Sequence, residues 1–205
     1  MTLPGIAVTY QGEEIGMTNG QISYEDTVDP AGCNCGPDRY DAIGCSRDPE
    51  RTPMQWSGTE PNAGFSTADK TWLPVAENFE TVNVESENAD PLSHLNVFKT
   101  LIFSRNSDPA FDVGQFKGVT RGNMLGYSRT FDPTFYPTYV TLVNFDNEQG
   151  TQDFSGEFGN SVQTGVVYVS TGGLHQQGYL LLDYLSFMIC GVEFDFASFS
   201  GTLLT

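Results

Sequence analysis

The sequence predicts two fold classes in one chain: the last β/α unit of a parallel α/β barrel, followed by an antiparallel β-sandwich domain. Three observations predict this order. A short apolar run fills residues 5–10, a helical stripe of apolar residues covers 91–105, and β-branched and aromatic runs separated by turns follow residue 108. A strand followed by a helix is the repeating unit of parallel barrels, and serial short strands are typical of sandwiches.

The apolar run at residues 5–10 reads Gly-Ile-Ala-Val-Thr-Tyr, between Pro4 and Gly12. It does not alternate with polar residues, so we expect a strand buried on both faces, as in a parallel sheet. A parallel strand needs neighbours, and no candidate precedes it. We therefore expect this chain to be part of a longer one.

Residues 11–90 show neither a helical nor a strand period and are dense in Gly, Pro, Asn, Asp, Ser and Thr. Loops of this length are uncommon in compact domains and usually carry function. We interpret this stretch as an elaborate loop over a binding site.

The helix is expected over residues 91–105, with Asp90 as its N-cap and Pro91 at its first position. The apolar positions recur at three- and four-residue steps and form one stripe: Leu92, Leu95, Phe98, Leu101 and Ile102. His94 lies off this stripe, which favours a surface or packing role over a ligand role. The strand, loop and helix together make an incomplete barrel part, 1–105.

The remaining residues, 106–205, are expected to form the antiparallel β domain. Three strands stand out by β-branched and aromatic content: 124–131, 139–145 and 164–170. Residues 179–192 fit a last strand, a short buried helix or a non-native tail, and 174–205 as a whole is an atypical tail.

The net charge is −17, from 26 acidic against 9 basic residues. This charge repels phosphate backbones and anionic membrane surfaces, so nucleic-acid and membrane partners are not expected. The start has no signal-peptide pattern, and no apolar stretch reaches the roughly 18 residues of a membrane span. A neutral substrate such as a sugar is compatible with the charge.

The four cysteines do not form a metal-binding pattern. Cys33 and Cys35 are separated by one residue, which is the wrong spacing for zinc, and neither histidine lies nearby. No metal and no cofactor are therefore predicted. A Cys35–Cys45 disulfide and free thiols both remain open, and Cys190 adds no constraint.

Several motifs occur in one order along the chain. They are Leu3-Pro4-Gly5, Tyr10-Gln11-Gly12-Glu13-Glu14-Ile15-Gly16-Met17, Ser46-Arg47-Asp48-Pro49-Glu50-Arg51-Thr52-Pro53-Met54-Gln55-Trp56, Asn62-Ala63-Gly64-Phe65-Ser66 and Trp72-Leu73-Pro74. Together they resemble the maltases and oligo-1,6-glucosidases of the α-amylase superfamily, and residues 26–34 resemble the insect-type maltases in particular. The resemblance is dense from residue 2 to about 105, and weakens beyond it.

This resemblance implies that the chain holds strand 8, the long active-site loop and helix 8 of a (β/α)8 TIM barrel. Members of the family are retaining enzymes, which need a carboxylate nucleophile and a carboxylic acid/base about 5 Å apart. In the family these groups, and an Asp preceded by His, lie N-terminal to the Leu-Pro-Gly motif. No His-Asp pair occurs in this sequence. The catalytic residues are therefore expected upstream of Met1, and this chain alone is expected to be inactive.

Two residues are predicted to bind substrate. Arg47 matches the family arginine at the terminal glucose, where a rigid donor fork suits sugar hydroxyls; the alternative is a surface arginine. Asp29 lies in a loop that in relatives approaches the leaving-group subsite, and its match is loose. Glu13 and Glu14 are not predicted to be catalytic, because adjacent residues of an extended chain point to opposite sides. We expect them to anchor loops.

Other residues of the long loop are expected to be structural. Arg51, Gln55 and Trp56 are expected to lock the loop through hydrogen bonds and burial, and Trp72 is expected in the core rather than as a platform for a sugar.

Three functions are compatible with the sequence. The first is part of a secreted or membrane-anchored extracellular α-glucosidase that releases glucose from maltose- or sucrose-like oligosaccharides. The second is a non-catalytic relative that resembles the heavy chains of amino-acid transporters. The third is a truncated remnant without activity. The match of Arg47 and of residues 26–29 to the maltase pattern favours the first.

Overall fold

A five-stranded sheet and a long, loop-rich segment make up the part of the chain that the computed structural model describes: residues 1–34, 45–59, 61–145, 151–154, 157–158, 165–170, 185–189 and 202–204. The structure divides into unit 1, Met1–Ala7 with Asn96–Thr205, and unit 2, Val8–Leu95. The predicted boundary between residues 105 and 106 referred to domains of a longer protein, and stays a prediction.

The strand predicted at residues 5–10 is not formed. Residues 6–10 have no regular secondary structure, and the side chains of Ile6 and Val8 are 95% and 85% exposed. The prediction was wrong for this chain because a parallel strand exists only by hydrogen bonding to neighbouring strands, and no strand in the described part of the chain pairs with this segment.

Unit 2 is built from short helices joined by irregular backbone. They are the 3-10 helices η1 (Glu13–Ile15), η2 (Asp48–Arg51) and η3 (Asn62–Gly64), and the α-helices α1 (Pro30–Cys33) and α2 (Val84–Ala89). Buried Ile15, Met54 and Leu95 form a small core against which Phe65 and Val82 pack. The long loop is therefore organised by tight turns rather than by long elements.

Helix α3 (His94–Ser107) confirms the predicted helix but begins later than expected. Asp90 does not cap α3; its carboxylate accepts the N–H of Leu92 at 2.9 Å and closes a turn before the helix. Glu87 Oε2 instead accepts a hydrogen bond from the Leu95 N–H at the start of the helix, at 2.9 Å. Pro91 lies in this turn, so residues 91–93, which were expected to begin the helix, are not helical.

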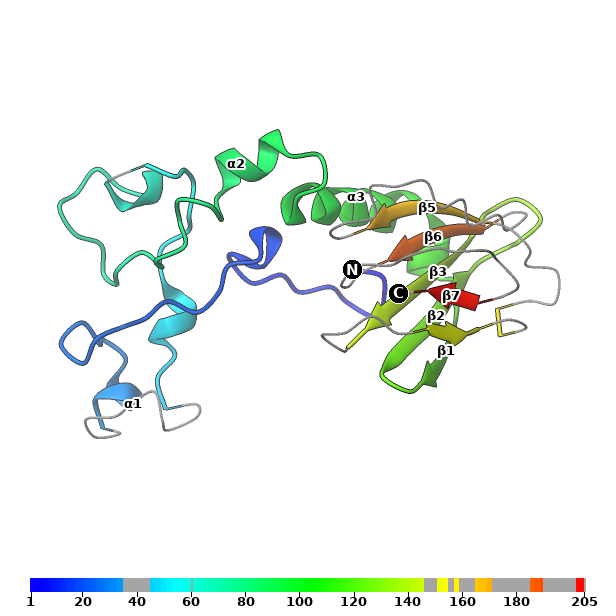
Figure 1. The fold of residues 1–205 in the computed structure, drawn as a ribbon, viewed down its shortest axis with the longest axis horizontal. Coiled ribbons are helices and arrows are strands. Elements are labelled where there is room, and N and C mark those ends of the chain that lie inside the picture. Colours follow the sequence, from blue (N-terminus) through cyan, green and yellow to red (C-terminus); the bar gives the residue numbers. More distant parts are fainter. Residues whose placement is uncertain are drawn as a thin grey trace. The chain divides into compact units, whose positions relative to one another are not determined.

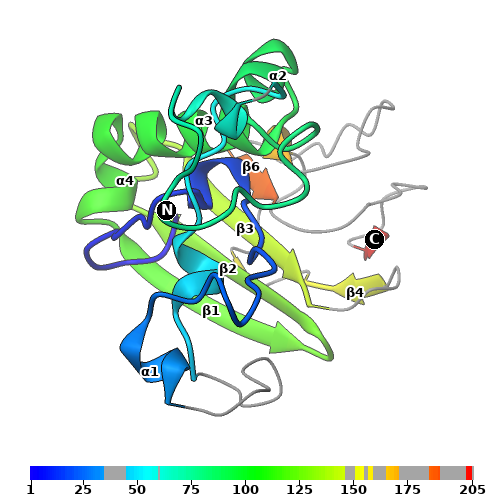
Figure 2. The same ribbon diagram turned by 90° about the vertical axis from the view of Figure 1, so that its left-hand side faces the viewer.

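The main sheet of unit 1 has the strand order β1-β2-β3-β6-β5. The strands are β1 (Gln115–Arg121), β2 (Met124–Thr130), β3 (Thr138–Asn144), β5 (Gly165–Ser170) and β6 (Leu185–Ile189). Figure 1 and Figure 2 show β1, β2 and β3 side by side. The three predicted strands are confirmed in β2, β3 and β5, and the open interval 179–192 contains strand β6.

The all-antiparallel prediction holds for only part of this sheet. β1, β2 and β3 are antiparallel neighbours, whereas β6 pairs parallel with β3 and with β5. Parallel neighbours need a connection of about a dozen residues or more, and residues 171–184 between β5 and β6 supply one. A separate two-stranded antiparallel sheet joins β4 (Thr151–Asp153) to β7 (Thr202–Leu204). The face-to-face sandwich stays a prediction.

The described core of unit 1 lies where helix α4 (Pro109–Asp112) meets the sheet. Ala110 and Phe111 are buried with Tyr139, and the rings of Phe111 and Tyr139 are 4.4 Å apart between centroids. The Tyr139 hydroxyl donates to Asp108 Oδ2 at 2.8 Å. Within the residues described, no helix is long and apolar enough to cross a membrane.

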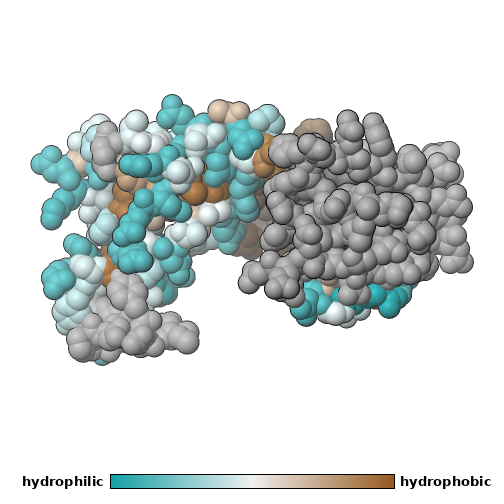
Figure 3. All heavy atoms as spheres, in the orientation of Figure 1, coloured by the Kyte–Doolittle hydropathy of each residue, from teal (hydrophilic) through white to brown (hydrophobic). Residues whose placement is uncertain are grey.

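Hydrophilic side chains predominate among the coloured residues on the face drawn in Figure 3, and hydrophobic ones form small separated areas there. Large hydrophobic side chains are also exposed on the described residues, among them Ile6, Phe103 and Phe135.

Candidate functional site

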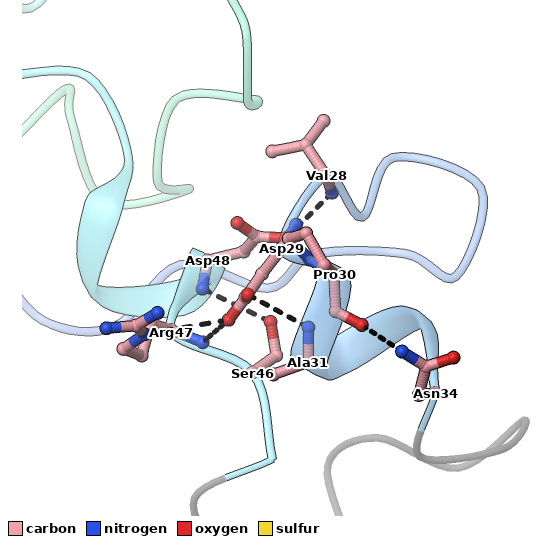
Figure 4. Close-up of polar contacts among 8 residues, drawn as sticks. All are labelled: Val28, Asp29, Pro30, Ala31, Asn34, Ser46, Arg47 and Asp48. Carbon is pink, nitrogen blue, oxygen red and sulfur yellow. Dashed lines mark hydrogen bonds and ion pairs between the residues drawn. The ribbon is translucent and has the colours of Figure 1, made fainter.

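The two residues predicted to bind substrate, Asp29 and Arg47, are in contact in unit 2. Asp29 Oδ2 accepts the backbone N–H of Arg47 at 2.8 Å, and the Arg47 Nε lies 3.8 Å from the same oxygen. Figure 4 shows the Asp29 carboxylate between the loop that carries Arg47 and the start of helix α1. The structure therefore brings the two together.

Their side chains differ sharply in exposure. The side chain of Asp29 is 4% exposed, whereas that of Arg47 is 61% exposed. Asp29 Oδ1 accepts the Ala31 N–H at 3.1 Å, so this carboxylate also caps α1. The backbone hydrogen bonds from Arg47 and Ala31 lower the pKa of Asp29 and keep it ionised near neutral pH.

A second carboxylate, Asp48, braces the same loops. Its Oδ2 accepts the N–H groups of Val28 and Asp29 at 2.8 and 2.9 Å, while its own N–H donates to Ser46 Oγ at 3.2 Å. We call Val28, Asp29, Ser46, Arg47 and Asp48 the carboxylate knot. Two buried carboxylates thus fix two loops to each other through backbone groups.

Sequence reasoning missed Asp48. A clue was available, because Asp29 and Asp48 both precede a proline, and Asp-Pro often begins a short helix. In the structure Pro30 opens α1 and Pro49 lies in the first turn of η2. The two Asp-Pro dipeptides therefore lie at the starts of α1 and η2, and the hydrogen bonds of the carboxylate knot join these two helix starts.

Close approach of the backbone also shapes the knot. A Cβ added at Gly32 would lie 2.8 Å from Cβ and Oγ of Ser46. Only glycine lets α1 approach this loop so closely, which explains why a glycine stands in the middle of a helical turn.

Chemically, the knot presents an exposed guanidinium on an immobilised backbone. Arginine carries five N–H donors in a planar fork, which suits recognition of adjacent sugar hydroxyls. The two carboxylate oxygens of Asp29 contact backbone N–H groups and the side chain of Arg47. In this structure Asp29 therefore positions Arg47. Direct contact between Asp29 and a substrate stays a prediction.

The paired acids Glu13 and Glu14 anchor their own turn, as expected. Glu13 Oε2 accepts the Tyr10 N–H at 3.1 Å, and Glu14 Oε2 accepts the Gly12 N–H at 2.8 Å. Gly12 has a φ of 94°, a conformation that glycine adopts without strain. Each carboxylate is therefore committed to local backbone structure.

Arg51, Gln55 and Trp56 were expected to lock the long loop, and the structure shows this for Gln55. Its fully buried amide Nε2 donates to Asn78 Oδ1 at 3.2 Å and to the carbonyl of Val82 at 2.6 Å. The Trp56 side chain is 51% exposed, so Trp56 contributes through its backbone, whose N–H donates to the Ala63 carbonyl at 2.9 Å.

Trp72 was expected in the core, and this was wrong, because 51% of its side chain is exposed. Its indole N–H donates to the Arg51 carbonyl at 3.1 Å, and its ring meets Phe65 edge to face at 5.3 Å. The amphipathic indole satisfies its N–H at the loop surface rather than inside the core.

No group of three or more His, Cys, Asp or Glu that could hold a metal ion occurs among the described residues. Cys33 is a free, exposed thiol, and Cys45 is disulfide-bonded. Cys35, Cys190 and His175 lie outside the described residues, as does most of the predicted tail.

With this geometry described, comparison with known proteins defines the family. The family described as "Alpha amylase, catalytic domain" matches residues 1–114, more than half of the chain. The chain belongs to the α-amylase family. This confirms the resemblance inferred from the ordered motifs.

Within that family, the similar proteins are α-glucosidases. The chain is 41% identical over 178 residues to Maltase A1 of Drosophila melanogaster, which covers 86% of this chain and 30% of that protein. It is 40% identical over 190 residues to the salivary alpha-glucosidase of Aedes aegypti, covering 93% of this chain and 32% of that protein. The chain thus spans about a third of the length of these relatives.

A solved structure agrees with this placement. The trehalulose synthase MutB of Pseudomonas mesoacidophila MX-45 is 26% identical and has a TM-score of 0.70, over 87% of this chain and 33% of the synthase. The likeness supports the same fold family for this chain.

Proposed function

We propose that this chain is the C-terminal part of a maltase-type α-glucosidase and supplies the arginine that holds the terminal glucose. The observation that carries the proposal is the carboxylate knot, which holds Arg47 by its backbone and leaves its side chain 61% exposed. The ordered maltase motifs around the knot support the same assignment.

In this proposal the chain binds but does not perform the bond cleavage. Hydrolysis with retention proceeds by double displacement, and its two carboxylates sit at the ends of barrel strands. Glu13 and Glu14 are committed to their own turn, and Asp29 and Asp48 accept backbone N–H groups. None of these four acids is arranged as a nucleophile and acid pair, so the catalytic carboxylates would come from outside this chain.

The substrate in this proposal is a terminal α-glucoside of a maltose- or sucrose-like oligosaccharide. Arg47 would donate to the hydroxyls of the non-reducing glucose, and Asp29 would hold the arginine in place. A charge-assisted hydrogen bond contributes about 1.5–3 kcal/mol, enough to orient a sugar before reaction.

The proposed location is extracellular. Two relatives are named salivary alpha-glucosidases, those of Aedes aegypti and Anopheles gambiae, and this naming supports secretion. A disulfide at Cys45 fits an oxidising compartment. The alternative of a transporter heavy-chain relative is not favoured, because the similar proteins are named as glucosidases.

The test of the proposal starts from the native protein, captured with an antibody against residues 46–66. We expect a species several-fold heavier than 22.5 kDa that hydrolyses maltose. A species at that mass without activity would contradict the enzymatic role and support the truncated remnant.

Arg47 is then tested in the active protein. Arg47→Lys keeps the charge but loses the planar fork, so kcat/KM for maltose should fall about tenfold or more. Arg121→Lys, on the exposed strand β1, is the matched control and should leave kcat/KM unchanged. Equal activity of the Arg47 variant and the control would assign Arg47 to the surface.

A further inference from the structure

Side chains at least 100 residues further along the chain hold the N-terminal segment Met1–Gly5. The guanidinium of Arg105, near the end of α3, donates to the carbonyls of Met1, Leu3 and Gly5, with the Leu3 bond at 2.9 Å. Three alternate carbonyls of one segment thus converge on a single side chain.

Strand β2 binds the same segment from another element. The hydroxyl groups of Tyr127 and Thr2 share a hydrogen bond, and Arg129 Nη1 reaches the Thr2 carbonyl at 3.5 Å. Thr2 is only 8% exposed, although residues 1–5 form no helix or strand. The burial of Thr2 therefore depends on these side-chain contacts rather than on secondary structure of its own.

Arg129 is itself immobilised. It is 1% exposed, and its Nε and Nη2 donate to the carbonyls of Ala110 and Phe111 in α4 at 3.1 and 2.7 Å. Its planar fork therefore serves α4 and the N-terminal segment together, a geometry that the single point charge of lysine cannot reproduce.

The contacts lie where the chain crosses between the two units. It crosses once after Ala7, just beyond Gly5, and once after Leu95, in the helix that carries Arg105. Arg105 thus joins the two crossing segments through hydrogen bonds on the unit 1 side.

We propose that Arg105, Tyr127 and Arg129 form a clasp that keeps the segment Met1–Gly5 ordered on unit 1. Without these three side chains, the segment would have no other side-chain anchor described for it and would be mobile. The clasp does not depend on the glucose-binding role of Arg47.

The test is 15N relaxation on the full 205-residue chain. We expect backbone order parameters at Thr2, Leu3 and Gly5 to match those of β2, about 0.85, and to fall below about 0.6 in Arg105→Met. Arg121→Met, which removes a surface ion pair to Glu157, should leave them unchanged. Low order parameters in the unsubstituted chain would overturn the clasp.

Two variants that each remove a single hydrogen bond test the clasp if Arg105→Met also disorders the sheet. Tyr127→Phe keeps the ring against Phe116, 5.6 Å away between centroids, and removes only the hydroxyl. Thr2→Val removes the same hydrogen bond from the other side. Both should lower the order parameter at residue 2 while β2 stays rigid. An unchanged value in both would overturn the proposal.

Discussion

At the residue scale, single carboxylates organise the candidate site through backbone hydrogen bonds rather than through ion pairs. The carboxylates of Asp29 and Asp48 together accept four backbone hydrogen bonds, from Val28, Asp29, Ala31 and Arg47. The N–H of Asp48 in turn donates to Ser46 Oγ. Buried charge is tolerated only where such bonds replace water, so these positions tolerate few substitutions.

Asp29 makes stability depend on pH. Its folded-state pKa lies below the ordinary value of 3.8, so its stabilisation is present above about pH 4 and is lost as the pH falls through the folded-state pKa. Asp29→Asn should therefore lower the free energy of unfolding at pH 7 and flatten its decline in acid. Urea unfolding at several pH values measures both.

The control for this prediction is Glu25→Gln, which neutralises an exposed acid of the same unit. It should preserve the unfolding free energy at pH 7 and the acid decline. If Asp29→Asn behaved like this control, the carboxylate would not be holding the two loops.

The sequence indicated which residues to consider at the candidate site better than it indicated their contacts. Arg47 and Asp29 were each predicted from motif resemblance to bind substrate, and the structure puts them in contact. Asp48 was missed because it accepts the N–H groups of Val28 and Asp29, which are distant in sequence, and no side-chain pattern encodes such contacts. Trp72 was expected in the core, yet its N–H donates to the carbonyl of Arg51 at the loop surface.

At the scale of elements, local sequence determined the helices and strands that can form from their own residues. α3, β2, β3 and β5 were foreseen from periodicity and β-branched content. β1 was missed because most of its residues are exposed and it includes Gly118 and charged Lys117, so no alternation appears. The run at 5–10 has strand composition but lacks a partner strand, and pairing cannot be read from composition.

Helix α2 depends on its cap, because none of its residues is buried. Asn83 Oδ1 accepts the Ser86 N–H at 2.8 Å, and Asn83 Nδ2 donates to the Phe79 carbonyl at 2.8 Å. Asn83→Ala should lower the free energy of unfolding of unit 2 by about 1 kcal/mol or slightly more. Thermal unfolding followed by circular dichroism measures the loss.

Glu85→Ala, at an exposed position of the same helix, is the comparison. It leaves the N-cap in place and should change the unfolding free energy by less than about 0.5 kcal/mol. Equal losses at residues 83 and 85 would show that capping does not decide the stability of α2.

At the scale of the whole molecule, the main feature is the excess of negative charge. The chain carries 26 acidic and 9 basic side chains, which gives a net charge of −17. Excess charge of one sign keeps a protein soluble but destabilises its compact state through self-repulsion. The same excess of acidic residues predicts that nucleic acid is not a partner, and this stays a prediction. No sequence pattern indicated the mixed parallel and antiparallel order of the sheet.

Salt should therefore stabilise this chain. Raising ionic strength from about 0.01 M to about 0.15 M shortens the screening length from about 30 Å to about 8 Å, which weakens repulsion among distant acids. We expect a rise of several degrees in Tm, measured by differential scanning calorimetry in NaCl. A fall in Tm would mean that the surface ion pairs of Lys117 and Arg121 with Glu157 outweigh the repulsion.

The clasp also sets an order of events during protein synthesis. Met1–Gly5 leaves the ribosome well before Arg105, Tyr127 and Arg129 exist. At about 5–20 residues per second, the segment waits roughly 6–25 s before its last binding residue is made. The carboxylate knot, by contrast, joins residues no more than 20 positions apart. The candidate sugar-binding loop can therefore close while the nascent chain is short, and the segment translated before it is among the last to be placed.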